Sequence, residues 1–195
     1  MACLRAGGVI AAPTETVYGL MTRWDNVAGR ARIFAMKQRS AEKHLQMLAA
    51  SLAVAAPFIV ADDPRLAALA ERFWPGPLTV VVPGREGGTV GLRIPNHALT
   101  RQVLLELDSP LAATSANRSG EPAALTAREA VAGLAGEPDL LIDGGAIPPG
   151  GASTVVSLCE TPMKLLRAGP ILEDQLQEVL GRWTGLPTTK VSKTC

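Results

Sequence analysis

The stretch Gly8-Val9-Ile10-Ala11-Ala12-Pro13-Thr14-Glu15-Thr16-Val17-Tyr18-Gly19-Leu20 joins an apolar run to a polar turn. The apolar run predicts a buried strand, which Pro13 ends. The turn that follows offers two threonine hydroxyls and one carboxylate, and Gly19 lets the backbone come close to another group. Turns at strand ends often carry binding residues, although most polar turns are only connections. This stretch alone leaves both interpretations open.

Helical and strand-like patterns mix along the rest of the chain. Asp63-Pro64 reads as a cap and first turn before a helix over residues 64–73. Residues 78–82 and 90–94 read as two strands of a hairpin, which favours a sheet of mixed strand direction. We expect two further helices capped by Asp25 and by Asn96, a third after a Thr126–Glu129 capping box and a fourth over 172–183. Further strands are expected over 111–113, 140–142, 154–158 and 163–166.

Composition limits the class of protein. The chain has 195 residues, of which 47% are hydrophobic and 19% charged, as expected for one compact domain. We expect a domain over residues 1–185 and a flexible tail over 186–195. No apolar stretch approaches the roughly 20 residues that span a bilayer. Together with three scattered cysteines, which fit neither a disulfide framework nor a zinc site, this favours a cytoplasmic protein that contacts no membrane.

Charge is nearly balanced overall but uneven along the chain. The net charge of +1 argues against a protein that grips nucleic acid over its whole surface. Residues 23–43 are nevertheless locally basic, which is most often a solvated helix face. Helical spacing places Lys37 and Arg39 at the end of this segment. From there both side chains can turn toward an anion.

Several common catalytic motifs are absent from the sequence. Neither a P-loop nor a Gly-x-Gly-x-x-Gly motif occurs, and the two histidines, His44 and His97, poorly support a Ser-His-Asp hydrolase or a metal pair. The remaining polar motifs offer cations, hydroxyls and an amide, which suit a polyanion. Each also has a structural interpretation, such as a self-bonded turn for Ser115 and Asn117.

Five more motifs follow the opening stretch in a fixed order: Lys37-Gln38-Arg39-Ser40, Gly91-Leu92-Arg93-Ile94-Pro95, Thr114-Ser115-Ala116-Asn117-Arg118-Ser119-Gly120, Ser153-Thr154-Val155-Val156 and Leu166-Arg167-Ala168-Gly169. Together the six resemble the YrdC-like family of threonylcarbamoyl-AMP synthases from about Leu4 to about Glu178. The resemblance implies a sheet curled around a large concave basic face. It also implies a nucleotidyltransferase that makes L-threonylcarbamoyladenylate and pyrophosphate from L-threonine, bicarbonate or CO2, and ATP with Mg2+.

The resemblance also implies roles for individual residues. Lys37 and Arg39 would act in catalysis by neutralising charge and positioning phosphates, with no dedicated acid or base and no metal ligand from protein side chains. The threonine-binding positions would be Thr16, Arg93, Ala113 and Ser153. The ATP-binding positions would be Lys37, Arg39, Lys43, Thr89, Ser115, Asn117, Ala123 and Arg167.

Four positions depart from the family pattern. Lys43 stands where many relatives have asparagine, and Ala123 where serine is frequent. Leu48 replaces a histidine found near threonine in some relatives, and Met21 replaces a common glycine. The chain also ends soon after the core, so we expect none of the C-terminal domain of longer relatives.

The resemblance implies that the product serves modification of the adenosine next to the anticodon in tRNAs that read codons beginning with A. The downstream threonylcarbamoyl transferase proteins would then be transient partners. One alternative is a non-catalytic module that binds tRNA or double-stranded RNA on the same face, although 4% aromatic residues offer few stacking platforms. Another is a carbamoyl-adenylate-handling domain like that of hydrogenase-maturation proteins.

Overall fold

A computed structural model describes residues 1–38, 40 and 44–181. Its strands are β1 (Ile10–Pro13), β2 (Tyr18–Arg23), β3 (Gln46–Leu48), β4 (Leu78–Pro83), β5 (Thr89–Arg93), β6 (Leu111–Ser115), β7 (Leu140–Leu141), β8 (Thr154–Ser157) and β9 (Lys164–Arg167). Its helices are α1 (Ala2–Arg5), α2 (Val27–Lys37), α3 (Leu52–Ala55), α4 (Pro64–Phe73), α5 (Ala98–Leu107), α6 (Ala127–Ala132) and α7 (Glu173–Leu180).

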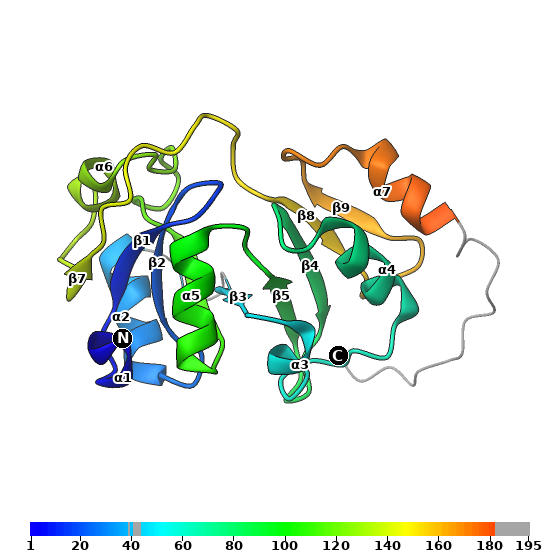
Figure 1. The fold of residues 1–195 in the computed structure, drawn as a ribbon, viewed down its shortest axis with the longest axis horizontal. Coiled ribbons are helices and arrows are strands. Elements are labelled where there is room, and N and C mark those ends of the chain that lie inside the picture. The colour runs from blue at the N-terminus through cyan, green and yellow to red at the C-terminus, as the bar shows by residue number, and fades with distance from the viewer. Residues whose placement is uncertain (39, 41–43, 182–195) are drawn as a thin grey trace.

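Within the described residues, nine strands form one sheet in the order β7-β1-β2-β6-β3-β5-β4-β8-β9 (Figure 1). Neighbours such as β1 and β2 run antiparallel, whereas β3 and β5, and β4 and β8, run parallel. This confirms the predicted single-domain α/β fold with a mixed sheet and flanking helices.

One half of the sheet, built from β1, β2 and β6, is covered on both faces. Alternate side chains of its strands enter two apolar clusters, because successive residues of a strand point to opposite faces. Leu20 and Ala112 pack with Ile33 of α2 and Ala130 of α6 in one cluster. The other cluster packs these strands against α1 and α5.

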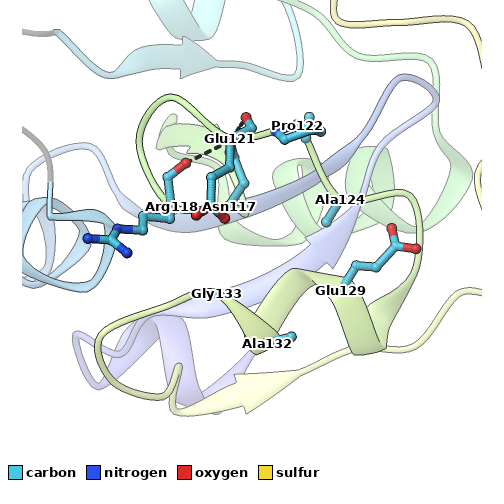
Figure 2. A pocket seen from close by; sticks show the side chains of 9 residues that line it. Asn117, Arg118, Glu121, Pro122, Ala124, Glu129, Ala132 and Gly133 are labelled. Atoms are coloured by element: carbon cyan, nitrogen blue, oxygen red, sulfur yellow. Dashed lines mark hydrogen bonds between the residues drawn. The ribbon is translucent and has the colours of Figure 1, made fainter.

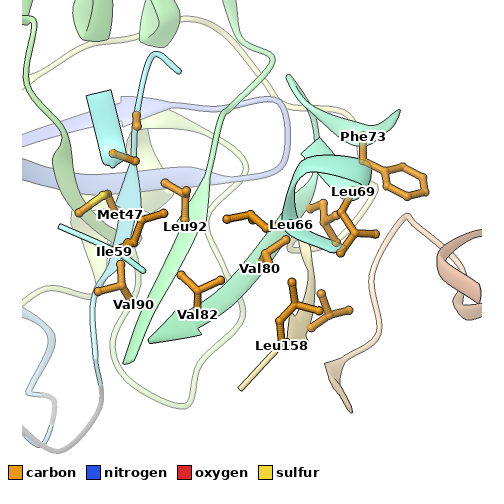
Figure 3. Packing of buried hydrophobic residues seen from close by; sticks show 14 of the residues in the cluster. Met47, Ile59, Leu66, Leu69, Phe73, Val80, Val82, Val90, Leu92 and Leu158 are labelled. Atoms are coloured by element: carbon orange, nitrogen blue, oxygen red, sulfur yellow. The ribbon is translucent and has the colours of Figure 1, made fainter. Parts of the chain in front are cut away.

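The other half, built from β5, β4 and β8, packs its core on one face (Figure 3). The apolar cluster there joins Val80, Leu92 and Val156 to residues of α3, α4 and α7. The residues next to these in each strand point to the opposite face of the sheet. Of these, Val81, Gly91 and Val155 are only half-buried and belong to none of the three apolar clusters described. None of these clusters therefore covers the opposite face in the middle of the sheet, hereafter the open face.

Two predicted helix caps are wrong by one residue. The N-cap of α2 is Asn26, whose side chain accepts a hydrogen bond from the Gly29 amide at 3.0 Å. Asp25 instead binds Arg23 through two hydrogen bonds of 2.9 and 2.6 Å, which commits its carboxylate. The N-cap of α5 is His97 rather than Asn96, with no side-chain cap bond.

The other predicted elements are confirmed within a few residues. Asp63 caps α4, and the buried stripe of that helix is Leu66, Leu69, Ala70 and Phe73. Thr126 caps α6, but the Glu129 carboxylate accepts from the Leu125 amide instead of closing the box on Thr126. Trp183 and the tail over 186–195 lie outside the described residues. Within the described part of the chain, no helix has the length and apolar character needed to span a membrane.

Candidate active site

The turn between β1 and β2 is held by the side chain of Thr14. Its hydroxyl donates to the Val17 carbonyl at 2.7 Å and accepts from the amides of Thr16 and Val17 at 3.2 Å. Because this hydroxyl has only one proton, the Thr16 hydroxyl must be the donor in the 2.9 Å contact between the two threonines. The turn is therefore rigid and presents Thr16 as an acceptor.

Arg93, the last residue of β5, reaches this turn. Its Nη1 donates to the Thr16 hydroxyl at 2.9 Å, its Nε donates to the Gly76 carbonyl at 3.2 Å, and its Nη2 lies 2.8 Å from Glu15 Oε1. The last contact is an ion pair without hydrogen-bond alignment, since Nη2 and both Glu15 oxygens are buried and make no hydrogen bond. Arg93 is 2% exposed, so its charge depends on Glu15.

Lys37, at the end of α2, is 1% exposed. Its ammonium donates to the carbonyls of Ser115 and Asn117, the latter at 2.6 Å, and to Asn117 Oδ1 at 3.1 Å. The Ser115 hydroxyl donates to the same Oδ1 at 2.6 Å. Asn117 Nδ2 in turn donates to the Glu121 carbonyl at 2.6 Å. Lys37 thus anchors the loop that follows β6, bringing three predicted nucleotide-binding residues together.

Arg167, on the edge strand β9, binds Ser153. Its Nε donates to the Ser153 carbonyl and its Nη2 to the Ser153 hydroxyl, both at 3.0 Å. The approach depends on Gly169, whose missing Cβ would lie 2.4 Å from the Thr154 nitrogen. Burial, and then repulsion by the charge of Arg93, lower the pKa of the Arg167 guanidinium below its usual value. An anion bound near both arginines would relieve that repulsion.

Strand register arranges the open face in three successive rows, about 7 Å apart because side chains recur every second residue. In the first row Arg93 pairs with Leu48, and the pairing of Val80 with Leu92 puts Thr79 across from Arg93. In the second row Gln46 pairs with Ala113 and lies beside Gly91. Ser115 and Thr89 continue β6 and β5 by two residues into the third row.

The rows separate Arg93 from two of the predicted nucleotide-binding residues. Arg93, a predicted threonine-binding residue, is in the first row, and the predicted nucleotide-binding residues Ser115 and Thr89 are in the third. Thr89 therefore lies four residues, or about 13 Å, from Arg93 along β5. Ala113, 2% exposed, lies between them.

Three predicted residues depart from this order. Arg167, a predicted nucleotide-binding residue, is level with the first row through its pairing with Val155. Ala113, a predicted threonine-binding residue, is in the second row, and Thr16 precedes β2, whose Gly19 pairs with Ser115 of the third row.

Ala123 lines a cavity of about 350 Å³ beside Asn117. The walls of this cavity come from the loop after β6 and from α6 (Figure 2). Of the residues that depart from the family pattern, Leu48 and Met21 are buried in the apolar cluster under α5. Arg39 and Lys43, both predicted to bind ATP, lie outside the described residues.

Sequence reasoning assigned no role to three polar residues near this face: Glu15, Gln46 and Thr79. Glu15 lies in the opening turn, but its partner Arg93 is far away along the chain, so no local sequence pattern predicts this ion pair. Thr79 and Gln46 lie within short strands. The period-two pattern of the hairpin, which turns Val80 and Val82 inward, could have placed Thr79 on the open face.

These features define an α/β protein with a polar, cation-lined site on the uncovered face of a mixed sheet. The chain belongs to the Sua5, YciO and YrdC family, since the family model described as "Telomere recombination" matches residues 2–169. A threonylcarbamoyl-AMP synthase of Pyrococcus abyssi (strain GE5 / Orsay) is 36% identical over 187 residues, covering 91% of this chain and 55% of the relative. A threonylcarbamoyl-AMP synthase of Bacillus subtilis (strain 168) is 33% identical over 190 residues, covering 92% and 55%.

A solved structure of P. abyssi Sua5 complexed with L-threonine superposes with a TM-score of 0.85 at 36% identity, covering 92% of this chain and 56% of that chain. The chain thus spans about half the length of these relatives.

Proposed function

We propose that this chain is a nucleotidyltransferase that forms L-threonylcarbamoyladenylate and pyrophosphate from L-threonine, bicarbonate and ATP. The observation that carries the proposal is the row arrangement of the open face. Arg93 stands about two rows from Ser115, a spacing that suits an amino acid at one end and a nucleotide at the other. The names of the relatives and the threonine complex of P. abyssi Sua5 support the same assignment.

In the proposed reaction, the neutral amine of threonine attacks the carbon of bicarbonate, forming a C–N bond and releasing water. An oxygen of the resulting carbamate then attacks the α-phosphorus of ATP, and the bond to pyrophosphate breaks. Both reactants are anions, so cations must offset their repulsion. Holding both in line also removes the entropy of a bimolecular encounter, worth about 7–11 kcal/mol in well-oriented cases.

The side chains divide this work. Arg93, with Thr16, would bind the carboxylate of threonine, close to Ser153 and Ala113. Ser115 and Asn117 would donate to phosphate or ribose oxygens once the nucleotide replaces the hydrogen bonds that their donors make within the loop. Lys37 would fix this loop, and Ala123 would line the nucleoside cavity. Arg167 would bind phosphate, as would Arg39 and Lys43, and Thr89 would contact the nucleotide from the third row. Arg167 lies near the charge of Arg93, so a phosphate bound by Arg167 would also reduce the repulsion between the two guanidinium groups.

The donor set of the site suits a nucleotide that brings its own metal ion. Lys37 and Arg167 are cations, and Ser115 and Asn117 are neutral, so the site matches phosphate oxygens. Mg2+ commonly binds through substrate phosphates and retained waters. We therefore assign it to the triphosphate, where it would offset phosphate charge.

The adenylate product would be consumed by a transferase that modifies the adenosine next to the anticodon of tRNA. Contact with that transferase, and with tRNA, would be transient. The proposed activity needs no RNA, so it can be tested on the chain alone.

The test is pyrophosphate release from ATP and Mg2+ by the purified protein, with L-threonine and bicarbonate each present or omitted. Release that needs both substrates is the expected result. Pyrophosphate release that continues when either L-threonine or bicarbonate is omitted would overturn the proposal. Absence of release, together with salt-sensitive RNA binding, would instead favour the RNA-binding alternative.

A further inference from the structure

Gln46 stands in the middle row of the open face, between the predicted threonine and nucleotide positions. It pairs with Ala113 of β6 on one side. On the other side lies Gly91 of β5, where an added Cβ would be 3.9 Å from Gln46 Cβ. Gly91 has no side chain and Ala113 has only a methyl group. Neither flanking residue therefore covers the amide of Gln46.

The orientation of this amide is fixed by a chain of hydrogen bonds that joins β9, the residue before β8, β4 and β3. Arg167 Nη2 donates to the Ser153 hydroxyl at 3.0 Å, which lies 2.8 Å from the Thr79 hydroxyl. Thr79 donates to Gln46 Oε1 at 3.2 Å. Since Thr79 has one proton and gives it to Gln46, Ser153 must donate to Thr79. Every donor in the chain points from Arg167 toward Gln46.

The acceptor of the Gln46 amide is thereby used, and its two N–H donors are left. Nε2 makes no hydrogen bond to any residue that the structure describes, and the side chain is only half-buried. The far end of the chain is the guanidinium of Arg167, so the hydrogen bonds are polarised toward the amide. Such an amide is suited to donate to an anionic oxygen on the open face.

We infer that Gln46 binds the anionic oxygens of bicarbonate and then the carboxylate oxygens of the carbamate formed from it. This inference rests on the proposed function. The carbamate must form on the amine of a threonine bound by Arg93 and must reach the α-phosphate of a nucleotide bound beside Ser115, and Gln46 lies on the sheet between Arg93 and Ser115. The middle row is where those two groups meet. In that row, Ala113 and Gly91 offer no polar side-chain atom, and Gln46 offers two donors.

The decisive variant is Gln46→Glu. Glutamate has the same shape and keeps an oxygen for Thr79, but it replaces the two donors by a negative oxygen. The KM for bicarbonate should rise about tenfold or more, as expected for losing a hydrogen bond to a charged group, with the KM values for ATP and threonine within about twofold. Gln46→Leu removes the donors without adding charge and should show the same selectivity with a smaller effect. Gln102→Glu, the same change on the exposed face of α5, is the matched control.

The assay is pyrophosphate release in buffer depleted of CO2, with bicarbonate titrated at saturating ATP and threonine, after thermal unfolding shows that each variant is folded. A selective rise in the KM for bicarbonate supports the inference. An unchanged KM, a rise shared equally by all three substrates, or a rise confined to ATP overturns it. If the unaltered protein releases no pyrophosphate with all three substrates, the proposed function itself fails, which is a different result.

Discussion

Arg93 and Glu15 form an ion pair of 2.8 Å in which the arginine side chain is 2% exposed and the glutamate 20%. A buried pair of this kind is costly to break from one side, because the remaining charge has no partner. Glu15→Gln and Arg93→Met should each lower the free energy of unfolding by about 3–5 kcal/mol. The double variant leaves no uncompensated charge, so it should lose much less than the sum.

Urea unfolding of the two single variants and the double variant measures this coupling directly. The exposed pair of Arg23 and Asp25 is the control, and its coupling should stay below about 1 kcal/mol. Additive losses at Glu15 and Arg93 would show that the pair does not act as a unit.

Lys37→Met should loosen the loop after β6. Methionine keeps the apolar stem of the lysine but removes the ammonium that donates to the Ser115 and Asn117 carbonyls. The lost hydrogen bonds should cost about 2–3 kcal/mol, because buried carbonyls are left without donors. Thermal unfolding reports the stability, and hydrogen exchange over 115–121 reports the loop.

The same variant should bind a non-hydrolysable ATP analogue about tenfold more weakly, since the donors of the loop lose their fixed position. Lys164→Met is the control, because that lysine is exposed on β9 and lies 4.0 Å from Glu160. Unchanged exchange over 115–121 would mean that Lys37 does not hold the loop.

Gly169→Ala should displace the strand that carries Arg167. A Cβ at residue 169 would stand 2.4 Å from the Thr154 nitrogen and 2.6 Å from the Ala152 carbonyl oxygen. Both are backbone atoms, so relief requires movement of β9 or β8. We expect a loss of about 1–3 kcal/mol, as for other overpacked sites.

Gly150→Ala is the matched control for Gly169→Ala. The nearest atom to its added Cβ is the Pro148 carbonyl oxygen at 4.0 Å, an ordinary contact. Its stability should change by no more than about 0.5 kcal/mol. Equal changes at the two glycines, measured by urea unfolding, would contradict the proposed contact between the segments.

Local signals in the sequence explain the elements better than the site. Asp63-Pro64 and the alternating strand 78–83 predict their elements because caps and side-chain alternation act over a few residues. The same signals misassigned the cap of α2, because Arg23 captures Asp25 and leaves Asn26 to the helix. A neighbouring side chain that binds the expected cap residue can thus make a prediction from that one residue wrong.

The strand order and the site depend on distant pairings that no local pattern encodes. β6 lies between β2 and β3 although about sixty residues separate it from β3 in the sequence. The contact of Thr79 with Ser153 bridges residues 74 positions apart. The family resemblance named many of the residues that face one another, but it did not predict that Thr16 and Arg93 would bind each other.

Asp139 should stabilise the fold in a pH-dependent way. Its Oδ2 accepts from Arg32 Nη1 at 2.6 Å and from the Val9 amide at 2.7 Å. The hydrogen bond from Arg32, and then that from Val9, hold the pKa of the Asp139 carboxyl below its ordinary value. With a folded pKa below the unfolded value, the stabilisation is complete above the unfolded pKa and is lost as pH falls through the folded one.

Asp139→Asn separates the effect of the charge from that of the hydrogen bond with the Val9 amide. The amide oxygen can still accept from Val9, so the variant loses mainly the pairing with Arg32. The difference in unfolding free energy between the unaltered protein and Asp139→Asn should be constant above about pH 5 and should shrink below about pH 4, near the unfolded pKa of aspartate. Asp139→Ala also leaves the Val9 amide without an acceptor and should cost about 1–2 kcal/mol more at neutral pH. Urea unfolding at several pH values measures both effects, and a difference for Asp139→Asn that stays constant down to pH 3 would show that the carboxylate charge does not contribute.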